Sequence, residues 1–478
     1  MIWLDRRKKR KDFVKTHLEG KGYKVNSDAL DIINTCELWY GNKDIENFHD
    51  RKNLNGAEIK LHKLNFAKRC CADDANLCEI ISVVPEEESE SVKFIEEIIR
   101  KNRFITQFRK QLEKVSATGT VGAYISLRNA KYMQANDGTI SVKDGTIKIN
   151  YVDADCILPL TVENDVVTEC AFAATNKVRG KEKTTLVEFL LEEGKYKAIT
   201  TVFDDKGNKI DDECITLQLG EVKPFSVMTN AEVNNIEDLD GYGLPKVYNA
   251  IPLFMAVDLC YNLLHGDLGK GDKLVFLNEL LACIKTDEKT GKPILTPQQK
   301  EIFILLGDEA GKLPTEKSLV QEYNPEIRID AITKAFELVL SLLSMSFGYG
   351  SKKYTFENGK ITTATEYIGT KQDAMQELNK QRANATEYIT DIIHAAMWFA
   401  NTFHNESHSL EEELSIEFDD SYVEDKVSKL ESMRADALSF GEVSILKVWY
   451  LMEKYNLTEE DAKKYINYTE EPVDDVED

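Results

Sequence analysis

The sequence predicts an α+β protein that is mostly helical, with one block of antiparallel strands in its first half. Two patterns indicate this class. Before residue 120 and after residue 228, apolar residues recur at three- and four-residue steps, the spacing of one helix face. Between them, short runs rich in β-branched and aromatic residues alternate with turn pairs such as Asp137-Gly138 and Asp144-Gly145, as in β-hairpins. The sequence has no repeat of fixed period, which argues against a solenoid.

Three helices are expected before the strand block. The first covers 27–40, where Ser27 is a good N-cap and Gly41-Asn42 ends the helix. The second follows Asn55-Gly56. The third runs from about Ser91 to Val115, with apolar residues on one face and Lys and Glu on the other.

After the strand block, two helices are expected to frame a small insertion. The first starts at Pro245, a favourable first-turn residue, and should kink near Pro252. Residues 270–328 have a mixed pattern that indicates a small α/β insertion. A mostly apolar helix then runs from Asp330 to about Phe347.

The longest helical pattern in the chain begins at Ala364 and continues to about Thr402, which is about 58 Å if the helix is straight. Thr363 and Glu366 have the spacing of a capping box, which satisfies backbone N–H groups of the first turn. Residues 411–478 are acidic and have helical patterns, and we expect the tail 469–478 to be disordered.

Composition describes an ordinary globular chain with an acidic surface. Its 478 residues are 42% hydrophobic and 30% charged, with a net charge of −23. This charge disfavours a protein that holds DNA tightly, because such proteins supply Lys and Arg to the phosphates. It is compatible with an acidic wall that DNA slides past, and equally with a charge that serves solubility alone.

We expect no membrane segment and no export signal. The longest apolar-rich stretch, Phe336–Phe347, is shorter than the roughly 20 residues that a span requires. The N-terminus has a basic run after Met1–Leu4 and no apolar region behind it. The nine cysteines should therefore be free thiols. Cys70, Cys71 and Cys78 lack paired zinc-ligand spacing and are interpreted as buried helix residues.

No catalytic motif is present, so we expect no catalytic residue, no metal site, no cofactor and no enzymatic activity. The glycine-rich and histidine motifs of nucleotide-binding proteins and metalloproteases are missing from the sequence. His404 and His408, with Glu406 and Glu411, could share a helix face, but solvated polar residues explain them as well. An acidic cluster, interpreted as a charged helix start, comprises Asp419, Asp420, Glu424 and Asp425. These two groups keep a metal-dependent DNA-processing enzyme as an alternative.

One long stretch carries a family resemblance. The run Phe347–Ile368, FGYGSKKYTFENGKITTATEYI, resembles the helix end, loop and TATE signature of portal proteins of tailed bacteriophages that infect Gram-positive bacteria. Tyr367 stands where an aliphatic residue is more usual. Shorter stretches that resemble the family, in the family's order, are Trp39–Asn42, Asn102–Phe104, Thr118–Ala123, Phe418–Lys426, Gly441 and Leu457–Ile466. Together the matches span about residues 30–467.

The resemblance implies the phage portal fold, with a β-rich wing block and a small α/β clip between two stem helices. The implied parts are the wing at 1–243, the first stem helix at 244–269, the clip at 270–328, the second stem helix at 329–347, the tunnel loop at 348–362, the long wing helix at 363–402, and the crown with the acidic tail at 403–478.

It also implies a homo-oligomeric ring, typically of about twelve copies, at one vertex of the capsid. Double-stranded DNA would pass through this ring during packaging and ejection. The implied partners are the terminase large subunit, the head–tail connector, and the major capsid and scaffolding proteins, with no membrane. The location would be the virion, with assembly in the host cytoplasm. Another phage head or tail subunit remains an alternative, although the order helix, insertion, helix, loop and long helix argues for a portal.

The candidate site is the implied tunnel loop with the helix start behind it. Loop residues expected to face the DNA channel are Gly348, Gly350, Lys352, Lys353, Tyr354, Phe356, Gly359 and Lys360; the helix-start motif is Thr363, Ala364, Thr365 and Glu366. Lysines and aromatic residues here could touch phosphates transiently and without sequence specificity. In a ring, a few weak contacts per copy become many. The alternative is an ordinary flexible connection between two helices.

Overall fold

The structure is a computed structural model of mixed helix and sheet, 49% helical and 26% strand, which confirms the α+β class. The residues that it describes are 12–52, 56, 58–85, 91–134, 140–143, 145–178, 180–211, 214–270, 274–278, 303–306, 320–323, 326–354, 364–419, 426–439, 444–455 and 457–468.

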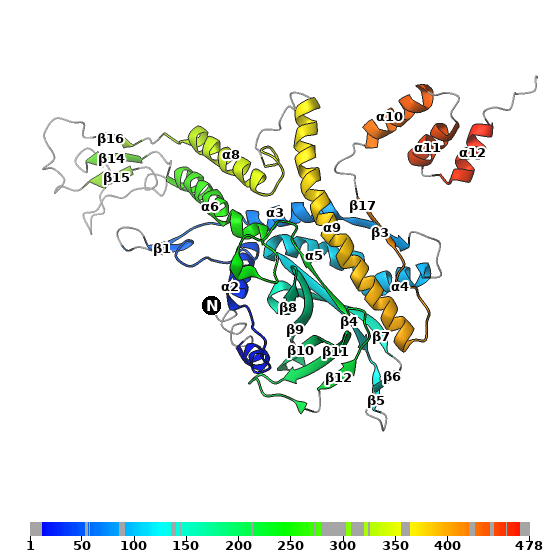
Figure 1. Ribbon diagram of the computed structural model, residues 1–478. Helices are drawn as coiled ribbons and strands as arrows, with labels where there is room; N and C mark the ends of the chain where they lie inside the picture. Colours follow the sequence, from blue (N-terminus) through cyan, green and yellow to red (C-terminus); the bar gives the residue numbers. More distant parts are fainter. Residues whose placement is uncertain are drawn as a thin grey trace, which may run out of the picture.

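Two antiparallel sheets form the centre of the body, which is the part of the molecule built before residue 246 (Figure 1). The larger sheet has the order β12-β11-β10-β9-β8 and the smaller one β13-β4-β7. Their aromatic residues pack together, with Phe172 of β9 against Tyr124 of β4 and Phe225 of β13. The antiparallel block predicted at 120–228 is thus confirmed. The strands are β4 Thr120–Arg128, β7 Thr146–Asp153, β8 Ile157–Glu163, β9 Val166–Val178, β10 Lys181–Glu192, β11 Lys195–Phe203, β12 Ile215–Gln218 and β13 Phe225–Thr229, with a separate hairpin of β5 Lys131–Gln134 and β6 Ile140–Lys143.

Residues 12–19 form a helix that was not predicted, and Phe13 and His17 on it contact Phe203 of β11. Four further helices come before β4; the last two pack directly on β7, and the starts of the four differ in part from the prediction. They are α2 Ser27–Tyr40, α3 Phe66–Ala75, α4 Val92–Asn102 and α5 Phe104–Thr118. The N-cap of α2 is Asn26, not Ser27, because the Asn26 side chain accepts a hydrogen bond from the Ala29 backbone N–H. A hairpin of β1 (Asp50–Lys52) and β2 (Glu58–Lys60) lies between α2 and α3.

The single helix predicted for 91–115 is wrong, because α4 and α5 are separate. The break falls at Arg103, whose φ of 51° lies in the left-handed region. Asn102 explains the position of the break. Its buried side chain donates to the Ile98 carbonyl and accepts from the Ile149 backbone N–H of β7, which holds the end of α4 on the sheet.

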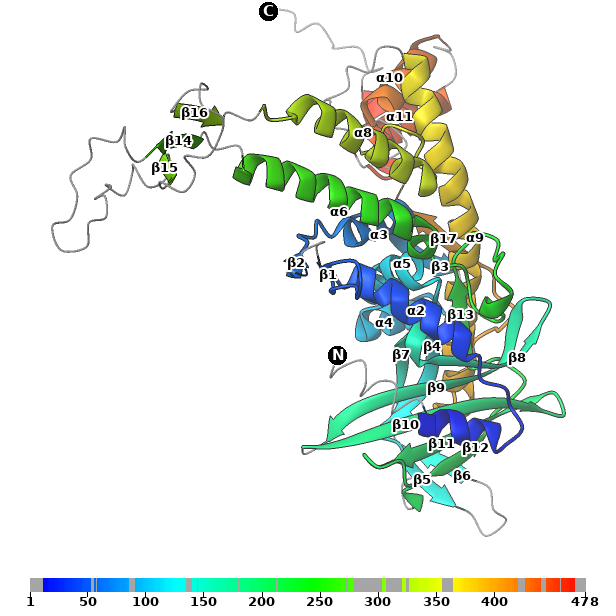
Figure 2. The same ribbon diagram turned by 90° about the vertical axis from the view of Figure 1, so that its left-hand side faces the viewer.

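A projecting arm follows the body (Figure 2). It consists of α6 (Lys246–Lys270), a small sheet and α8 (Ile329–Ser346), and the two helices lie side by side. Pro252 lies inside α6, which continues through it. Arg328 closes the arm by donating to both carboxylate oxygens of Asp267, at 2.7 and 2.9 Å. The sheet, in the order β15-β14-β16, contains β14 Leu274–Asn278, β15 Phe303–Leu306 and β16 Val320–Tyr323.

The sheet confirms strands in the predicted insertion, whose other residues lie outside the described ranges. β14 pairs with β15 in parallel and with β16 antiparallel.

The apolar composition of α6 also changes one expectation. By length and composition alone, Lys246–Gly269 could cross a membrane, so Phe336–Phe347 is not the longest apolar segment, contrary to the expectation from the sequence. One such helix is weak evidence, because the core helix of a protein passes the same test.

The long helix α9 runs from Ala364 to Phe403 and starts where the sequence predicts it. Its second half packs along the body and buries Tyr388, Ile392 and Ala396 (Figure 1).

The region after α9 was expected to be helical throughout, but Leu414–Phe418 is a strand, β17. It pairs antiparallel with β3 (Ile80–Pro85), and its alternating apolar residues were too few to predict it. The chain then forms α10 Lys426–Ser439, α11 Ser444–Tyr455 and α12 Glu459–Tyr468.

Candidate functional site

The end of α8 starts the predicted tunnel loop and turns the chain sharply. The Tyr349 N–H donates to the Ser344 carbonyl, and the Gly348 N–H to the Met345 carbonyl. Together these bonds form a Schellman motif, which requires a left-handed residue after the helix. Gly348 supplies it with a φ of 78°. A Cβ at this position would also approach Glu377 of α9 to about 3.0 Å, so the turn packs closely on the long helix.

Two tyrosines fasten the chain after this turn to α3. The Tyr349 hydroxyl donates to Asp74 at 3.1 Å, and the Tyr354 hydroxyl donates to Asp73 at 3.1 Å. Burial and the nearby acidic groups raise the pKa of both tyrosines, so they remain neutral donors. The Tyr354 N–H is bonded as well, to the Ser344 hydroxyl at 3.0 Å. Residues 348–354 are therefore held against the body.

Tyr354 thus differs from its expected position on a channel-facing loop. Its side chain is only 9% exposed, with Phe66 of α3 packed edge-on against its ring. Its hydroxyl shares Asp73 with Arg69, whose Nε lies 2.9 Å from the same carboxylate oxygen. The partner that buries Tyr354 comes from a helix about 280 residues earlier in the chain, so the local sequence carried no sign of it.

Lys246, the first residue of α6, links this turn to the long helix. Its Nζ lies 2.9 Å from Oδ1 of Asp74 and 3.0 Å from Oε1 of Glu377, and its side chain is 3% exposed. Burial alone would lower the pKa of Lys246, but the two carboxylates together raise it. We call Asp74, Lys246, Tyr349 and Glu377 the Asp74 cluster. It joins α3, α6, the turn and α9 at one point.

The Asp74 cluster could not be predicted from the sequence. A lysine at the start of a helix and single carboxylates within helices are ordinary surface residues in a sequence of this charge. Only the tertiary contacts among four separate segments bury them together. The one signal available was the acidic pair Asp73-Asp74 on a helix with buried cysteines.

The remaining predicted site residues are described only in part. Lys352 is exposed, and Lys353 is half-buried with its Nζ 5.7 Å from the centre of the Tyr349 ring. Gly350 has a φ of 69°. Ala364, Thr365 and Glu366 form the first turn of α9, as expected. The others, Phe356, Gly359, Lys360 and Thr363, lie outside the described residues.

Of the histidines considered for a metal site, His408 meets one of the acidic residues named with it, because its Nε2 lies 2.7 Å from Oε2 of Glu406. His404 Nε2 lies 2.6 Å from the Gly145 carbonyl, and His408 Nδ1 lies 3.2 Å from the Ser91 hydroxyl. Among the residues with described positions, no three His, Cys, Asp or Glu side chains are grouped as metal ligands would be. From the acidic cluster, only Asp419 is described; Asp420, Glu424 and Asp425 lie outside.

The cysteines near Asp73 are buried, as the sequence analysis predicted. Cys70 and Cys71 lie on α3 and Cys78 just after it, each at most 2% exposed. Burial raises the pKa of Cys70 and of Cys78 to about 12. A thiol with such a pKa is protonated at neutral pH and is a poor nucleophile and metal ligand.

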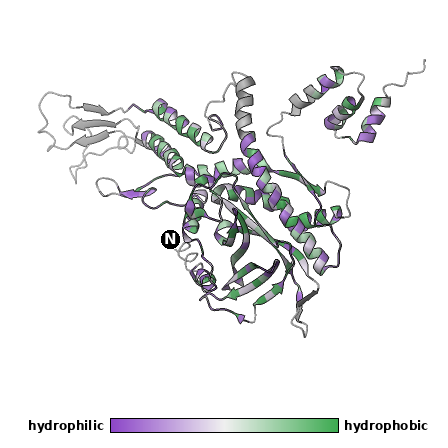
Figure 3. Cartoon of the chain, viewed as in Figure 1, coloured by the Kyte–Doolittle hydropathy of each residue, from purple (hydrophilic) through white to green (hydrophobic). Residues whose placement is uncertain are grey.

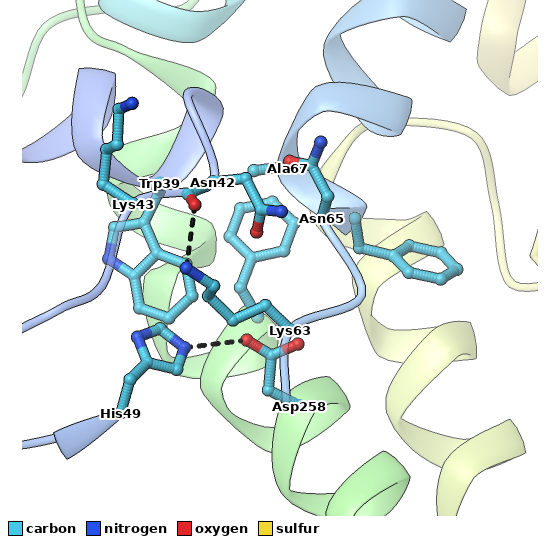
Figure 4. A pocket seen from close by; sticks show the side chains of 10 residues that line it. Trp39, Asn42, Lys43, His49, Lys63, Asn65, Ala67 and Asp258 are labelled. Atoms are coloured by element: carbon cyan, nitrogen blue, oxygen red, sulfur yellow. Dashed lines mark hydrogen bonds and ion pairs between the residues drawn. The ribbon is translucent and has the colours of Figure 1, made fainter. Parts of the chain in front are cut away.

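A second candidate is the small pocket in Figure 4, where His49 faces Asp258 of α6. His49 Nε2 and Asp258 Oδ2 are 3.1 Å apart, and both side chains are buried. The Ile45 N–H donates to His49 Nδ1 at 2.9 Å, which leaves the ring proton on Nε2 for Asp258. Both ring nitrogens are therefore used inside the protein. The pair fastens the segment after α2 to α6 and leaves no free nitrogen for acid–base chemistry.

No protein-family model matches this chain, and no curated protein sequence matches it significantly.

Proposed function

We propose that this protein is the subunit of a phage portal ring, a conduit through which double-stranded DNA enters and leaves the capsid. The observation that carries the proposal is the order and arrangement of the arm, the glycine turn and α9. Two helices project from the body and bear a small sheet at their far ends, and a turn with left-handed glycines where α8 meets the body leads to a 40-residue helix (Figure 2). This order accompanies the motif resemblance in Phe347–Ile368.

In this proposal, the arm helices are the stem and the small sheet belongs to the clip, which faces the terminase large subunit and later the head–tail connector. The body is the wing, in contact with the capsid and scaffolding proteins. Of the residues 403–478 expected to form the crown, β17 pairs with β3 of the body, so the crown proposed here consists of the helices α10, α11 and α12. The motor activity belongs to a partner ATPase. The acidic charge of −23 per copy suits a channel whose wall must not hold phosphates.

The Asp74 cluster gives this arrangement a physical basis. A conduit that transmits force needs its stem fixed to its wing, and the cluster holds the first residue of α6 to α3 and α9. Lys352 and Lys353 then stand at the base of the arm. There, in a ring, each copy would offer the DNA a few weak contacts.

Electron microscopy of the purified protein, combined with native mass spectrometry, tests the proposal. We expect annular particles with a mass that is an integer multiple of 54.4 kDa. Well-folded protein that stays monomeric at every concentration, alone and with capsid components, would contradict the portal function.

A further inference from the structure

Two histidines on the outside of the molecule lie against each other. His62 belongs to the segment between β2 and α3, and His265 lies on the second half of α6. Their ring centres are 4.3 Å apart, with an angle of 48° between the ring planes, and both residues are exposed. Because imidazole nitrogens are the commonest metal ligands in proteins, two histidines that meet from separate segments are a candidate metal site.

The ring nitrogens of this pair differ from those of the other histidines. Five of the seven histidines have a ring nitrogen within hydrogen-bond or ion-pair distance of another protein group: His17, His49, His394, His404 and His408. No hydrogen bond or ion pair joins a ring nitrogen of His62 or His265 to another residue that the structure describes. The two rings with unused nitrogens are therefore the two that lie together.

Helix α6 holds His62 in place through Asn262, which lies three residues before His265. The Asn262 side chain accepts a hydrogen bond from the His62 backbone N–H at 2.9 Å and donates one to the His62 carbonyl at 2.8 Å. One turn earlier, Asp258 accepts from the Leu64 backbone N–H at 2.9 Å. Both backbone groups of His62 are thus bonded to the helix that carries His265. A metal ion would not have to order a loose segment, which lowers the entropic cost of binding.

The separation of the two rings fits two imidazoles on one metal ion. A ligating nitrogen lies ~2.1 Å from Zn²⁺, and the centre of its ring lies ~1.1 Å behind the nitrogen. Two such ligands at right angles place their ring centres about 4.5 Å apart, and at the tetrahedral angle about 5.2 Å apart. The observed 4.3 Å is close to the first value. Rotation of the two side chains therefore suffices to bring one nitrogen of each ring onto a common ion.

The surroundings suit a cation that keeps water ligands. The β1–β2 hairpin, which leads into the segment of His62, is largely exposed and is purple in Figure 3. Lys63, beside His62 in the sequence, is engaged by Asp44 and the Asn42 carbonyl. The net charge of −23 raises the local concentration of cations. Two imidazoles with water favour Zn²⁺, Ni²⁺ or Cu²⁺ over Mg²⁺ and Ca²⁺, which prefer oxygen ligands.

We propose that His62 and His265 bind one divalent late transition-metal ion, of the class of Zn²⁺, Ni²⁺ and Cu²⁺, with water in the remaining positions. The ion fastens the second half of α6 to the segment before α3, one turn beyond the contacts of Asp258 and Asn262. Because the unfolded chain does not hold the two imidazoles together, the ion stabilises the folded protein. The site lies within one subunit, so the inference does not depend on the proposed function.

Calorimetric titration of the full-length protein with nickel chloride, in the absence of a histidine tag, tests the site. We expect one Ni²⁺ per chain. His62→Asn and His265→Asn should each weaken binding at least about tenfold, because one imidazole remains where two are needed. Both residues are exposed, so the Tm without metal should not change. The control is His404→Asn, at an exposed histidine outside the site, which should bind Ni²⁺ like the wild type.

Two further measurements report the ligands directly. Electron paramagnetic resonance of the protein loaded with Cu²⁺ counts the coordinating nitrogens. We expect splitting from two nitrogens in the wild type and in His404→Asn, and from at most one in either site variant. In thermal unfolding, Ni²⁺ should raise the Tm of the wild type and of the control. It should leave the Tm of His62→Asn and His265→Asn unchanged.

Three results would overturn the metal site. They are no binding by the wild type at up to ~1 mM Ni²⁺, equal affinity in the wild type and the site variants, and a single coordinating nitrogen in the wild-type Cu²⁺ spectrum. None of them depends on whether the protein forms rings, so failure of the metal site leaves the portal function standing. A strictly monomeric protein that binds Ni²⁺ through both histidines supports the site and contradicts the portal.

Discussion

The ammonium group of Lys246 and the carboxylate of Asp74 lie 2.9 Å apart inside the molecule, and this pair fixes the root of the arm. Asp74 also accepts the hydroxyl of Tyr349, and Lys246 also meets Glu377. One buried ion cluster therefore determines where α6 begins, where the chain turns after α8, and how α9 passes over both. Movement of any of these segments requires the others to find new partners for buried charges.

Removal of the cation should destabilise the protein strongly. Lys246→Met leaves Asp74 and Glu377, whose side chains are only 12% and 13% exposed, as buried carboxylates without their cation. We expect a loss of about 3–5 kcal/mol in the free energy of unfolding, measured by urea titration. The control is Lys380→Met, which removes a 62% exposed partner of the same Glu377. It should cost no more than about 1 kcal/mol. Equal losses of stability in the two variants would contradict the prediction that the buried ion pairs of Lys246 stabilise the protein more than the exposed pair of Lys380.

The tyrosine anchors should protect the start of the loop from proteases. Tyr354→Ala removes the bond to Asp73 and the packing on Phe66. Opening of residues 348–354 should then cost less free energy, and trypsin should cleave after Lys352 or Lys353 at least about tenfold faster, since each 1.4 kcal/mol of lost anchoring gives a factor of ten. Tyr455→Ala, at a 58% exposed tyrosine of α11, is the control. Unchanged cleavage in Tyr354→Ala would mean that these anchors do not limit opening.

The part of the fold that depends on local pattern could be predicted from the sequence. The strand block at 120–228 and the start of α9 at Ala364 follow from periodicity and turn residues, and the structure has both. The capping pattern at Thr363 and Glu366 located the helix start, although only the backbone of Glu366 is described. At such positions the preference for helix or strand comes from residues that are close in the sequence, so the sequence pattern is enough to predict the element.

What the sequence could not predict depends on distant partners. Asn102 ends α4 because its side chain accepts a hydrogen bond from the Ile149 backbone N–H of β7. The residues next to Asn102 in the sequence do not indicate that β7 will pack there. Tyr354 turned inward because Asp73 lies beside it in space. Lys246 is the clearest case, because a buried charge must be compensated, and the two carboxylates that compensate Lys246 come from two other helices far away in the sequence.

Glu232 should make the protein less stable as pH rises. Burial raises the pKa of this carboxyl, with further contributions from nearby acidic groups and an opposing one from Lys246. A pKa that is higher in the folded state means that folding favours the protonated form. Its stabilising contribution is complete below the ordinary pKa of 4.5 and is lost as pH rises through the folded pKa.

Glu232→Gln keeps the shape and removes this loss. Urea unfolding should therefore show the variant to be more stable than the wild type at pH 7, with the difference shrinking toward pH 4. The control is Glu221→Gln, at an exposed glutamate. A stability difference for Glu232→Gln that does not change between the two pH values would contradict a half-buried carboxyl that titrates with a raised pKa.

The loop lysines should influence DNA and leave assembly intact, if the protein is a portal. The triple change of Lys352, Lys353 and Lys360 to alanine removes three positive charges per copy, and a ring multiplies the loss by its number of copies. We expect the amount of DNA retained in filled heads to fall, because fewer cations oppose its escape. The decrease should be largest at low salt, where phosphate contacts are strongest. Quantitative PCR of nuclease-protected DNA measures this effect.

The control replaces three exposed lysines of the strand block, Lys181, Lys195 and Lys206, and changes net charge equally. Lys353 lies over the Tyr349 ring, but the hydroxyl groups of Tyr349 and Tyr354 donate to Asp74 and Asp73, so these anchors and ring formation should persist in both variants. A loop variant that fails to form rings would show that these lysines support the fold, and equal DNA loss in both variants would assign the effect to overall charge.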